Sequence, residues 1–258
     1  MASPFVWFDL NTPQINDAVD FYTAVVGWQV EPWGPPDQPY LMFKPATAGP
    51  IGGVMPLNDQ AKAMGAPPHW LGHVAVRDLE ASLEKVQANG GRALSPVVHV
   101  PTVGRMAPVA DNSGAVFSVF QPESAGMTPP SGEVVGAACW AEVLADSLEG
   151  ALGFYGAVFG WRKVAEHNMP NGVYVILGDD ENPMGFGGLM VKPMTEMTGA
   201  WMYYFHVADL DASVATATSR GASLFMPVMD VPGGRVAVME DPQKAAFCLW
   251  GKPLPSAS

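Results

Sequence analysis

Apolar and polar residues follow one another along this chain in short blocks that switch between two spacings. Residues 15–26 carry apolar side chains at helical spacing and end at Gly27, which predicts an amphipathic helix. Thr12-Pro13 is typical of a helix N-cap and first helical residue. One strand-like run comes before this helix and three come after it, at residues 5–10, 28–33, 40–44 and 51–55. The predicted order is β-α-β-β-β.

The same order of elements is predicted three more times. The second set starts with a strand from Trp70 and a helix capped by Asp78, and the fourth starts with a strand from Trp201 and a helix capped by Asp209. The third set has a strand at 138–144 and a helix at 147–159. The remaining strands are expected at 93–100, 105–110, 115–121, 162–165, 174–177, 187–191, 223–229, 235–239 and 246–250. The chain therefore consists of four βαβββ modules.

These modules form two copies of one larger unit. Trp7-Phe8-Asp9-Leu10, Phe21-Tyr22 and Gly27-Trp28 return 133 residues later as Trp140-Ala141-Glu142-Val143, Phe154-Tyr155 and Gly160-Trp161. The segment 122–132 is rich in Pro, Ser and Gly and has the composition of a linker. We therefore expect a boundary near residue 130, with domains at 1–125 and 133–258.

Composition and charge exclude several classes of protein. Apolar residues make up 48% of the chain and charged residues 15%, but Gly and Pro interrupt every apolar run well before the roughly 20 residues of a membrane span. The N-terminal residues lack the pattern of a secretion signal, so we expect a cytoplasmic protein with no membrane partner. The net charge of −12, with no cluster of Lys or Arg, disfavours nucleic acid as a partner. Cys139 and Cys248 are expected to be buried free thiols.

A βαβββ module with Phe-Tyr near the end of its helix and Gly-Trp just after it resembles the vicinal oxygen chelate superfamily. Glyoxalase I, bleomycin-resistance proteins and extradiol dioxygenases belong to that superfamily. The likeness extends to Gly52-Gly53 and to Asp111-Asn112-Ser113-Gly114, which becomes Asp241-Pro242-Gln243-Lys244 in the second half. The resemblance covers nearly the whole chain. It implies an α+β fold in which four βαβββ modules form two glyoxalase-like domains with cupped mixed sheets.

The resemblance also locates the positions at which metal-dependent relatives hold a divalent ion. The first-strand ligand, fourteen residues before the Phe of Phe-Tyr, falls on Trp7 and Trp140, and an indole cannot bind a metal. The closing-strand Glu falls on Ser118 and Cys248. The other candidate closing strands, within 51–55 and 185–191, contain no Asp or Glu either. We therefore predict no bound metal and no cofactor.

Four residues are candidates for chemistry. Strand alternation places Asp9 on the face of Trp7, and Glu142 on the face of Trp140. His73 and Tyr204 occupy equivalent positions, each five residues before a helix cap. The catalytic candidates are Asp9 with His73 and Glu142 with Tyr204. The alternative is that both carboxylates satisfy structural partners and that His73 is a core residue.

The abundance of aromatic residues and methionine predicts the kind of ligand. The chain has 8 Trp, 12 Phe, 6 Tyr and 15 Met. Six residues are expected to line the cups and bind a ligand: Trp7, Phe117, Ser118, Trp140, Phe247 and Cys248. The predicted function is metal-free binding of a hydrophobic or aromatic small molecule.

Two alternatives stay open. One is a metal-dependent lyase, isomerase or extradiol-type dioxygenase. The other is that one half serves as a degenerate scaffold that completes the fold or a dimer surface. The protein is expected to be either a monomer or a homodimer.

Two further features have more than one interpretation. Arg105 and Arg235 either grip a carboxylate of the substrate or pair with Asp111 and Asp241 across a turn. The pairs Gly52-Gly53 and Gly187-Gly188 do not open a helix, so they are expected to mark close backbone approaches or bulges rather than a nucleotide site.

Overall fold

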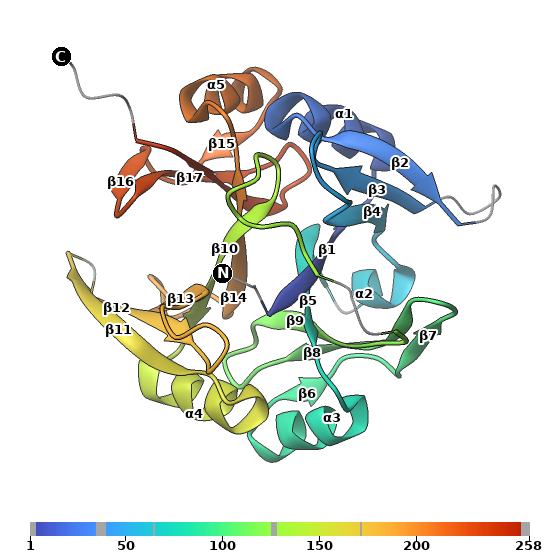
Figure 1. Ribbon diagram of the computed structural model, residues 1–258, viewed down its shortest axis with the longest axis vertical. Helices are drawn as coiled ribbons and strands as arrows, with labels where there is room; N and C mark the ends of the chain where they lie inside the picture. Colours follow the sequence, from blue (N-terminus) through green and yellow to red (C-terminus); the bar gives the residue numbers. More distant parts are fainter. Residues whose placement is uncertain (1–3, 35–39, 64, 125–127, 171, 254–258) are drawn as a thin grey trace. The chain divides into compact units, whose positions relative to one another are not determined.

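The computed structural model describes residues 4–34, 40–63, 65–124, 128–170 and 172–253, and these have an α+β fold (Figure 1). The helices are α1 (Ile15–Val26), α2 (Asp59–Ala63), α3 (Leu79–Ala88), α4 (Leu148–Phe159) and α5 (Leu210–Ser219). The strands of the first half are β1 (Phe5–Thr12), β2 (Gln29–Trp33), β3 (Tyr40–Lys44), β4 (Gly52–Pro56), β5 (His69–Ala75), β6 (Arg92–Ala93), β7 (Val98–Val100), β8 (Gly104–Ala110) and β9 (Val116–Pro122). Those of the second half are β10 (Ala138–Ala145), β11 (Arg162–Met169), β12 (Gly172–Gly178), β13 (Gly187–Val191), β14 (Ala200–His206), β15 (Ser223–Leu224), β16 (Met229–Val231), β17 (Gly234–Glu240) and β18 (Ala246–Gly251).

The strands form mixed sheets, as predicted, and each half of the sequence contributes its strands to one sheet. Each module supplies one consecutive run of strands. The runs are β2-β3-β4-β1, β5-β9-β8-β6, β11-β12-β13-β10 and β14-β18-β17-β15. In every module the first strand pairs in parallel with the last long strand, as β1 does with β4 and β10 with β13. The four predicted modules are therefore confirmed.

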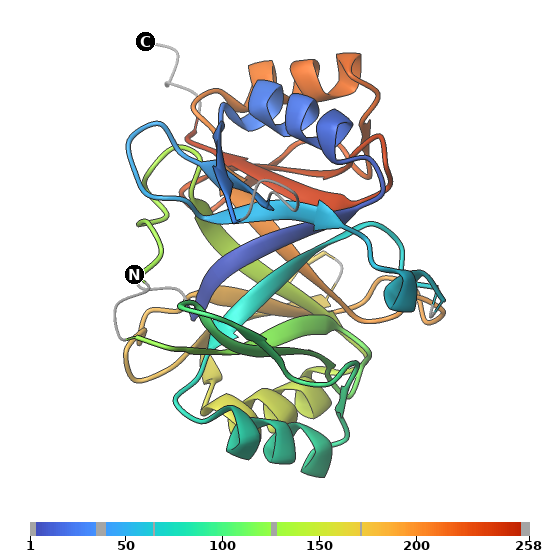
Figure 2. The same ribbon diagram turned by 90° about the vertical axis from the view of Figure 1, so that its right-hand side faces the viewer.

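The chain divides into two compact units, and each unit combines one module from either half of the sequence. The first unit contains residues 1–7, 71–129 and 140–202, and the second contains residues 8–70, 130–139 and 203–258. Helix α3 lies beside α4 in the first unit, and α1 lies beside α5 in the second (Figures 1 and 2). The predicted boundaries at 1–125 and 133–258 describe the sequence repeat and stay a prediction. Residues 125–127 of the predicted linker lie outside the described residues.

A buried hydrogen-bond cluster joins the two modules of the second unit. Tyr22 of α1 donates its hydroxyl proton to Asp241, in the turn between β17 and β18, at 2.9 Å, and accepts a hydrogen bond from Trp70 Nε1 at 3.0 Å. The other carboxylate oxygen of Asp241 accepts hydrogen bonds from the backbone N–H groups of Gln243 and Ala245. Burial, followed by the charge of Asp241, raises the pKa of Tyr22.

The first unit contains the same cluster. Tyr155 of α4 donates to Asp111 at 2.7 Å and accepts from Trp201 Nε1 at 2.9 Å, and Asp111 also accepts from the backbone N–H groups of Ser113 and Ala115. Burial raises the pKa of the Asp111 carboxyl. The Phe-Tyr motif and the Asp-containing turn motif are therefore structural. Each supplies one side of a contact between two modules.

Several local predictions are corrected. Strand β1 continues to Thr12, and α1 begins at Ile15 with Gln14 as an N-cap that makes no side-chain capping bond. The single strands expected at 93–100 and 223–229 are each two short strands. Pro96 and Pro227 lie between the two pieces, where a residue without a backbone N–H cannot continue the ladder.

The two arginines do not pair with the aspartates of the turns. Arg105 pairs with Glu80 of α3, and Arg235 with Asp211 of α5. The turn carboxylates at 111 and 241 bind tyrosine instead. In the part of the chain that the structure describes, we find no helix with both the length and the apolar character needed to cross a membrane.

Candidate functional site

One face of the strands β10 and β12, in the first unit, is partly open to solvent. Along β10, Trp140, Glu142 and Leu144 are half-buried and alternate with buried residues. On β12, Tyr174 and Ile176 are half-buried in the same alternation. We call the face formed by these five side chains on β10 and β12, with β13 between the two strands, the open face. The residues that alternate with them on β10 and β12 are buried. Helix α4 contacts the strands β11 and β13 of the same sheet.

An indole and a phenol form a hydrogen bond on the open face. Trp140 Nε1 donates to the hydroxyl oxygen of Tyr174 at 2.8 Å. Glu142 on β10 and Ile176 on β12 are both in register with Gly188 on β13, and Tyr174 lies two residues before Ile176. The ring of Tyr174 crosses β13 over this glycine. A Cβ atom at Gly188 would lie 1.9 Å from the Tyr174 hydroxyl oxygen and 2.3 Å from Cζ.

The first half has an equivalent arrangement, in the second unit. Tyr40 on β3 crosses β4 over Gly53, where a Cβ atom would lie 2.3 Å from Cζ of the tyrosine. Its hydroxyl donates to Oδ1 of Asp9 on β1, a residue that is 7% exposed. Sequence analysis did not single out Tyr40 or Tyr174. The signal was present, since the two tyrosines are 134 residues apart and each precedes a Gly-Gly pair.

The close approaches predicted at the glycine pairs are confirmed. A Cβ atom at Gly52 would lie 1.9 Å from the carbonyl oxygen of Phe8, and one at Gly187 would lie 2.5 Å from that of Ala141. The first glycine of each pair thus leaves room for the backbone of the neighbouring parallel strand. The second leaves room for the ring of a tyrosine on the other neighbouring strand.

The remaining predicted catalytic residues lie on the first strands of the other two modules. His73 on β5 is 3% exposed, lies in register with Ser118 on β9, and has its ring edge-on to Phe120 with centroids 6.3 Å apart. Tyr204 on β14 is 6% exposed and lies in register with Cys248 on β18. Asp9 and His73 belong to different units, as do Glu142 and Tyr204. The two predicted catalytic pairs, Asp9 with His73 and Glu142 with Tyr204, therefore stay predictions.

Two of the predicted ligand-binding residues face the helices. Phe117 packs against α4 and Phe247 against α1, and both are fully buried. Sequence analysis expected them on the cup side. Ser118 and Cys248 follow them directly, so strand alternation gives these two the opposite face, where they are buried as well. The two tryptophans, Trp7 and Trp140, are half-buried on β1 and β10.

The residues at the metal positions of related proteins do not fit a divalent ion. Trp140 offers only an N–H donor, and Tyr174 already holds that donor. Ser118 is buried, and its hydroxyl faces the carbonyl of Ala107 at 3.5 Å. Across the described ranges, no three His, Cys, Asp or Glu side chains gather closely enough to form a metal site. This donor set is poor for any hard cation, so no step through a metal is derived.

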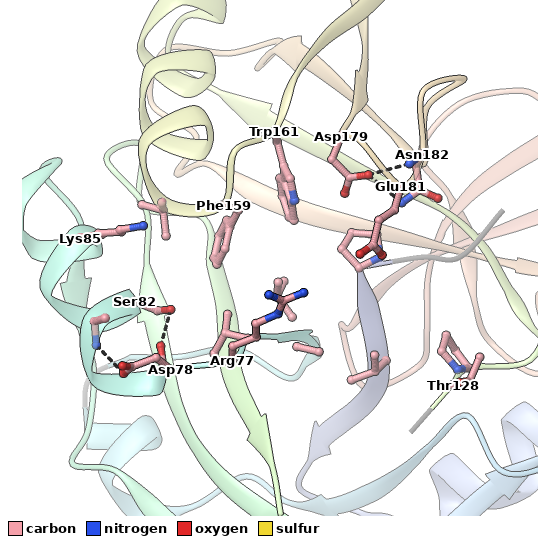
Figure 3. A pocket seen from close by; sticks show the side chains of 18 residues that line it. Arg77, Asp78, Ser82, Lys85, Thr128, Phe159, Trp161, Asp179, Glu181 and Asn182 are labelled. Carbon is pink, nitrogen blue, oxygen red and sulfur yellow. Dashed lines mark hydrogen bonds between the residues drawn. The ribbon is translucent and has the colours of Figure 1, made fainter. Parts of the chain in front are cut away.

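A separate cleft of about 550 Å³ lies within the first unit (Figure 3). Phe159 and Trp161 form an aromatic wall, and Arg77 and Glu181 point into the cleft (Figure 3). None of the ten predicted site residues lines it. The lining of the cleft combines cationic side chains, carboxylates and apolar side chains. Its chemistry therefore favours no single class of ligand. The open face remains the better candidate.

Comparisons with known proteins agree with this fold. Residues 5–119 match the model of the Glyoxalase/Bleomycin resistance protein/Dioxygenase superfamily, and residues 140–250 match that of the Glyoxalase-like domain. "Putative glyoxylase CFP32" of Mycobacterium tuberculosis (strain CDC 1551 / Oshkosh) is 32% identical over 96% of this chain and 94% of its own length. "Anthracycline biosynthesis protein DnrV" of Streptomyces peucetius is 30% identical over 94% of this chain and 91% of its own length.

Solved structures share this fold. A 2,2',3-trihydroxybiphenyl 1,2-dioxygenase from Sphingomonas wittichii strain RW1 aligns with a TM-score of 0.64 at 13% identity, over 97% of this chain and 91% of its own. A Mn(II)-bound glyoxalase from Novosphingobium aromaticivorans aligns with a TM-score of 0.62 at 12% identity, over 97% and 82%. At this identity the likeness shows the fold alone. The protein is a tandem of two glyoxalase-like domains. It belongs to the glyoxalase/bleomycin resistance protein/dioxygenase superfamily.

Proposed function

We propose that this protein binds a hydrophobic or aromatic small molecule on the open face of the second half, without a metal. The observation that carries the proposal is the indole–phenol pair of Trp140 and Tyr174. The pair stands on a half-buried face. Trp140 occupies the position that the resemblance to metal-dependent members assigns to a first-strand metal ligand.

The chemistry of the open face supports a flat, apolar ligand. Leu144 and Ile176 add aliphatic surface beside the two aromatic rings, and Glu142 is the single carboxylate among the five residues that define the face. Aromatic rings gain from offset-stacked or edge-to-face packing in addition to the area that they bury. Two relatives, from Streptomyces peucetius and Streptomyces sp. (strain C5), are named as anthracycline biosynthesis proteins, and anthracyclines contain planar fused rings. These names support an aromatic ligand here.

Calorimetric titration of EDTA-treated protein with quinizarin, the planar 1,4-dihydroxyanthraquinone, tests this proposal. We expect saturable binding at a stoichiometry of one, unchanged when Mn²⁺ or Fe²⁺ is added. Trp140→Ala removes the indole and is expected to weaken binding by about tenfold, which corresponds to roughly 1.4 kcal/mol of lost contact. Trp33→Ala is the control variant, because Trp33 lies on β2 in the other unit and is 43% exposed.

Two results would contradict the proposal. One is quinizarin binding that is the same in Trp140→Ala as in the unmodified protein. The other is binding that appears only after a divalent ion is added, with one equivalent of that ion retained by the protein. The second result would favour the alternative of a metal-dependent lyase, isomerase or extradiol-type dioxygenase.

A further inference from the structure

We propose that Asn11 on β1 is the centre of a second binding site, which takes a neutral small molecule with an amide or lactam group. The site belongs to the first half of the sequence and lies wholly within the second unit. It shares no residue with the open face, so this inference does not depend on the function proposed above.

The side chain of Asn11 uses little of its hydrogen-bonding capacity, although the residue is only 7% exposed. A carboxamide can donate two hydrogen bonds and accept two. In the part of the chain that the structure describes, Nδ2 donates one, to the backbone carbonyl of Asp9, and its length of 3.4 Å exceeds the usual range. The Oδ1 oxygen accepts none from a described residue. Buried polar groups are nearly always paired, so the fold alone does not account for this amide.

The equivalent position in the second half carries a leucine. Both residues are in register with a methionine on the neighbouring parallel strand, Asn11 with Met55 and Leu144 with Met190. A βαβββ module of this chain therefore forms with an apolar side chain at this position. Because replacing a poorly paired buried amide by an apolar group of similar shape costs a fold little, the asparagine points to recognition of a ligand.

The side chains around Asn11 suit a small organic molecule. Strand alternation places Asn11 on the face of Asp9, where Tyr40 crosses Gly53 and donates to the Asp9 carboxylate. Met55 is 36% exposed, and Met42 on β3 is half-buried and in register with Gly53. Methionine adapts its shape to a ligand and contacts aromatic rings favourably. The site thus combines a buried amide with adaptable apolar surface.

The chemistry of the carboxamide sets the class of ligand. Oδ1 is an acceptor and the remaining N–H of Nδ2 is a donor, and both lie in the plane of the amide. An amide or lactam carries a C=O and an N–H in the complementary arrangement, so it can satisfy both at once. A carboxylate would offer no N–H to Oδ1. The nearby carboxylate of Asp9 and the net charge of −12 also disfavour an anion.

Calorimetric titration with two flat probes tests the site. 2-Quinolinone is a bicyclic lactam with adjacent N–H and C=O groups, and N-methyl-2-quinolinone has the same rings without the N–H. We expect 2-quinolinone to bind the unmodified protein about tenfold more tightly, the effect of one neutral hydrogen bond with its partner left unpaired. Asn11→Leu keeps the branched shape of the side chain and should make the two Kd values equal. Asn168→Leu is the matched control, because Asn168 is an exposed asparagine on β11 in the other unit, and it should preserve the preference.

Urea unfolding of the same variants separates recognition from a structural role. Removal of an amide that the fold barely uses should leave the urea midpoint of Asn11→Leu equal to or above that of the unmodified protein. A fall of about 0.5 M or more in both Asn11→Leu and the smaller variant Asn11→Ala would overturn the proposal, because the amide would then hold the fold. A preference for 2-quinolinone that persists in Asn11→Leu would overturn it as well, and so would a failure of both probes to bind the unmodified protein. Quinizarin binding that depends on Trp140 would be unaffected by these results, so the function proposed for the open face stands or falls separately.

Discussion

Removing the hydroxyl of Tyr155 tests whether the Phe-Tyr motif joins modules, as its contacts indicate. In Tyr155→Phe the carboxylate of Asp111, 1% exposed, loses a donor at 2.7 Å, and Trp201 Nε1 loses an acceptor at 2.9 Å. A hydrogen bond to a charged group contributes about 1.5–3 kcal/mol and one between neutral groups about 0.5–1.5 kcal/mol. We therefore expect the free energy of unfolding to fall by roughly 2–4 kcal/mol.

Urea denaturation followed by tryptophan fluorescence measures this loss. Tyr22→Phe breaks the matching cluster of the second unit, so it should cost a similar amount. The double variant Tyr155→Phe/Trp201→Phe should cost less than the sum of the two single variants, because Trp201 and Tyr155 share one hydrogen bond. A change below about 0.5 kcal/mol in Tyr155→Phe, within the range of a surface substitution, would refute the structural role.

Three further predictions follow from burial and from close packing of the backbone. Burial raises the pKa of the Asp111 carboxyl. The stability that this shift contributes is fully present below the ordinary aspartate pKa of about 3.9 and is lost as pH rises through the raised pKa of the folded state. The free energy of urea unfolding, relative to that of Asp111→Asn, should therefore be higher at about pH 3 than at about pH 7, and the opposite order would contradict this reasoning. Gly52→Ala should cost about 1–3 kcal/mol in the same assay, whereas Gly49→Ala, with open space around its Cβ position, should be nearly neutral; equal effects would count against the close strand approach. Burial raises the pKa of Cys139 to about 12 and Cys248 is fully buried, so Ellman's reagent at about pH 8 should label two thiols quickly only in urea; fast labelling of the native protein would disprove this.

The sequence predicts the modules well because their signals are local. Strand alternation, helical spacing and terminal glycines such as Gly27 and Gly160 are set by neighbouring residues, and both glycines adopt the left-handed conformation that ends a helix. The 133-residue repeat then gives the number of modules. Pro96 and Pro227 interrupt the strands predicted at 93–100 and 223–229. This effect is also local, because proline lacks the backbone N–H that a strand ladder needs.

The pairing of modules could not be predicted from these signals. Tyr22 and Asp241 are 219 residues apart, and an identical motif pattern would result if each half packed on itself. The side of the sheet on which Phe117 lies was predicted wrongly for a different reason. It precedes Ser118 by one residue, and a strand places such neighbours on opposite sides. The position of the Tyr174 ring over β13 depends on Gly188, a glycine on an adjacent strand. A linear sequence pattern does not reveal which residues of neighbouring strands lie side by side.

The most direct test of the account is a crystal structure of EDTA-treated protein grown with quinizarin. We predict electron density for the fused rings against the indole of Trp140, with no anomalous signal from a transition metal. Quinizarin bound elsewhere on the protein, or bound through a metal ion on this face, would contradict it.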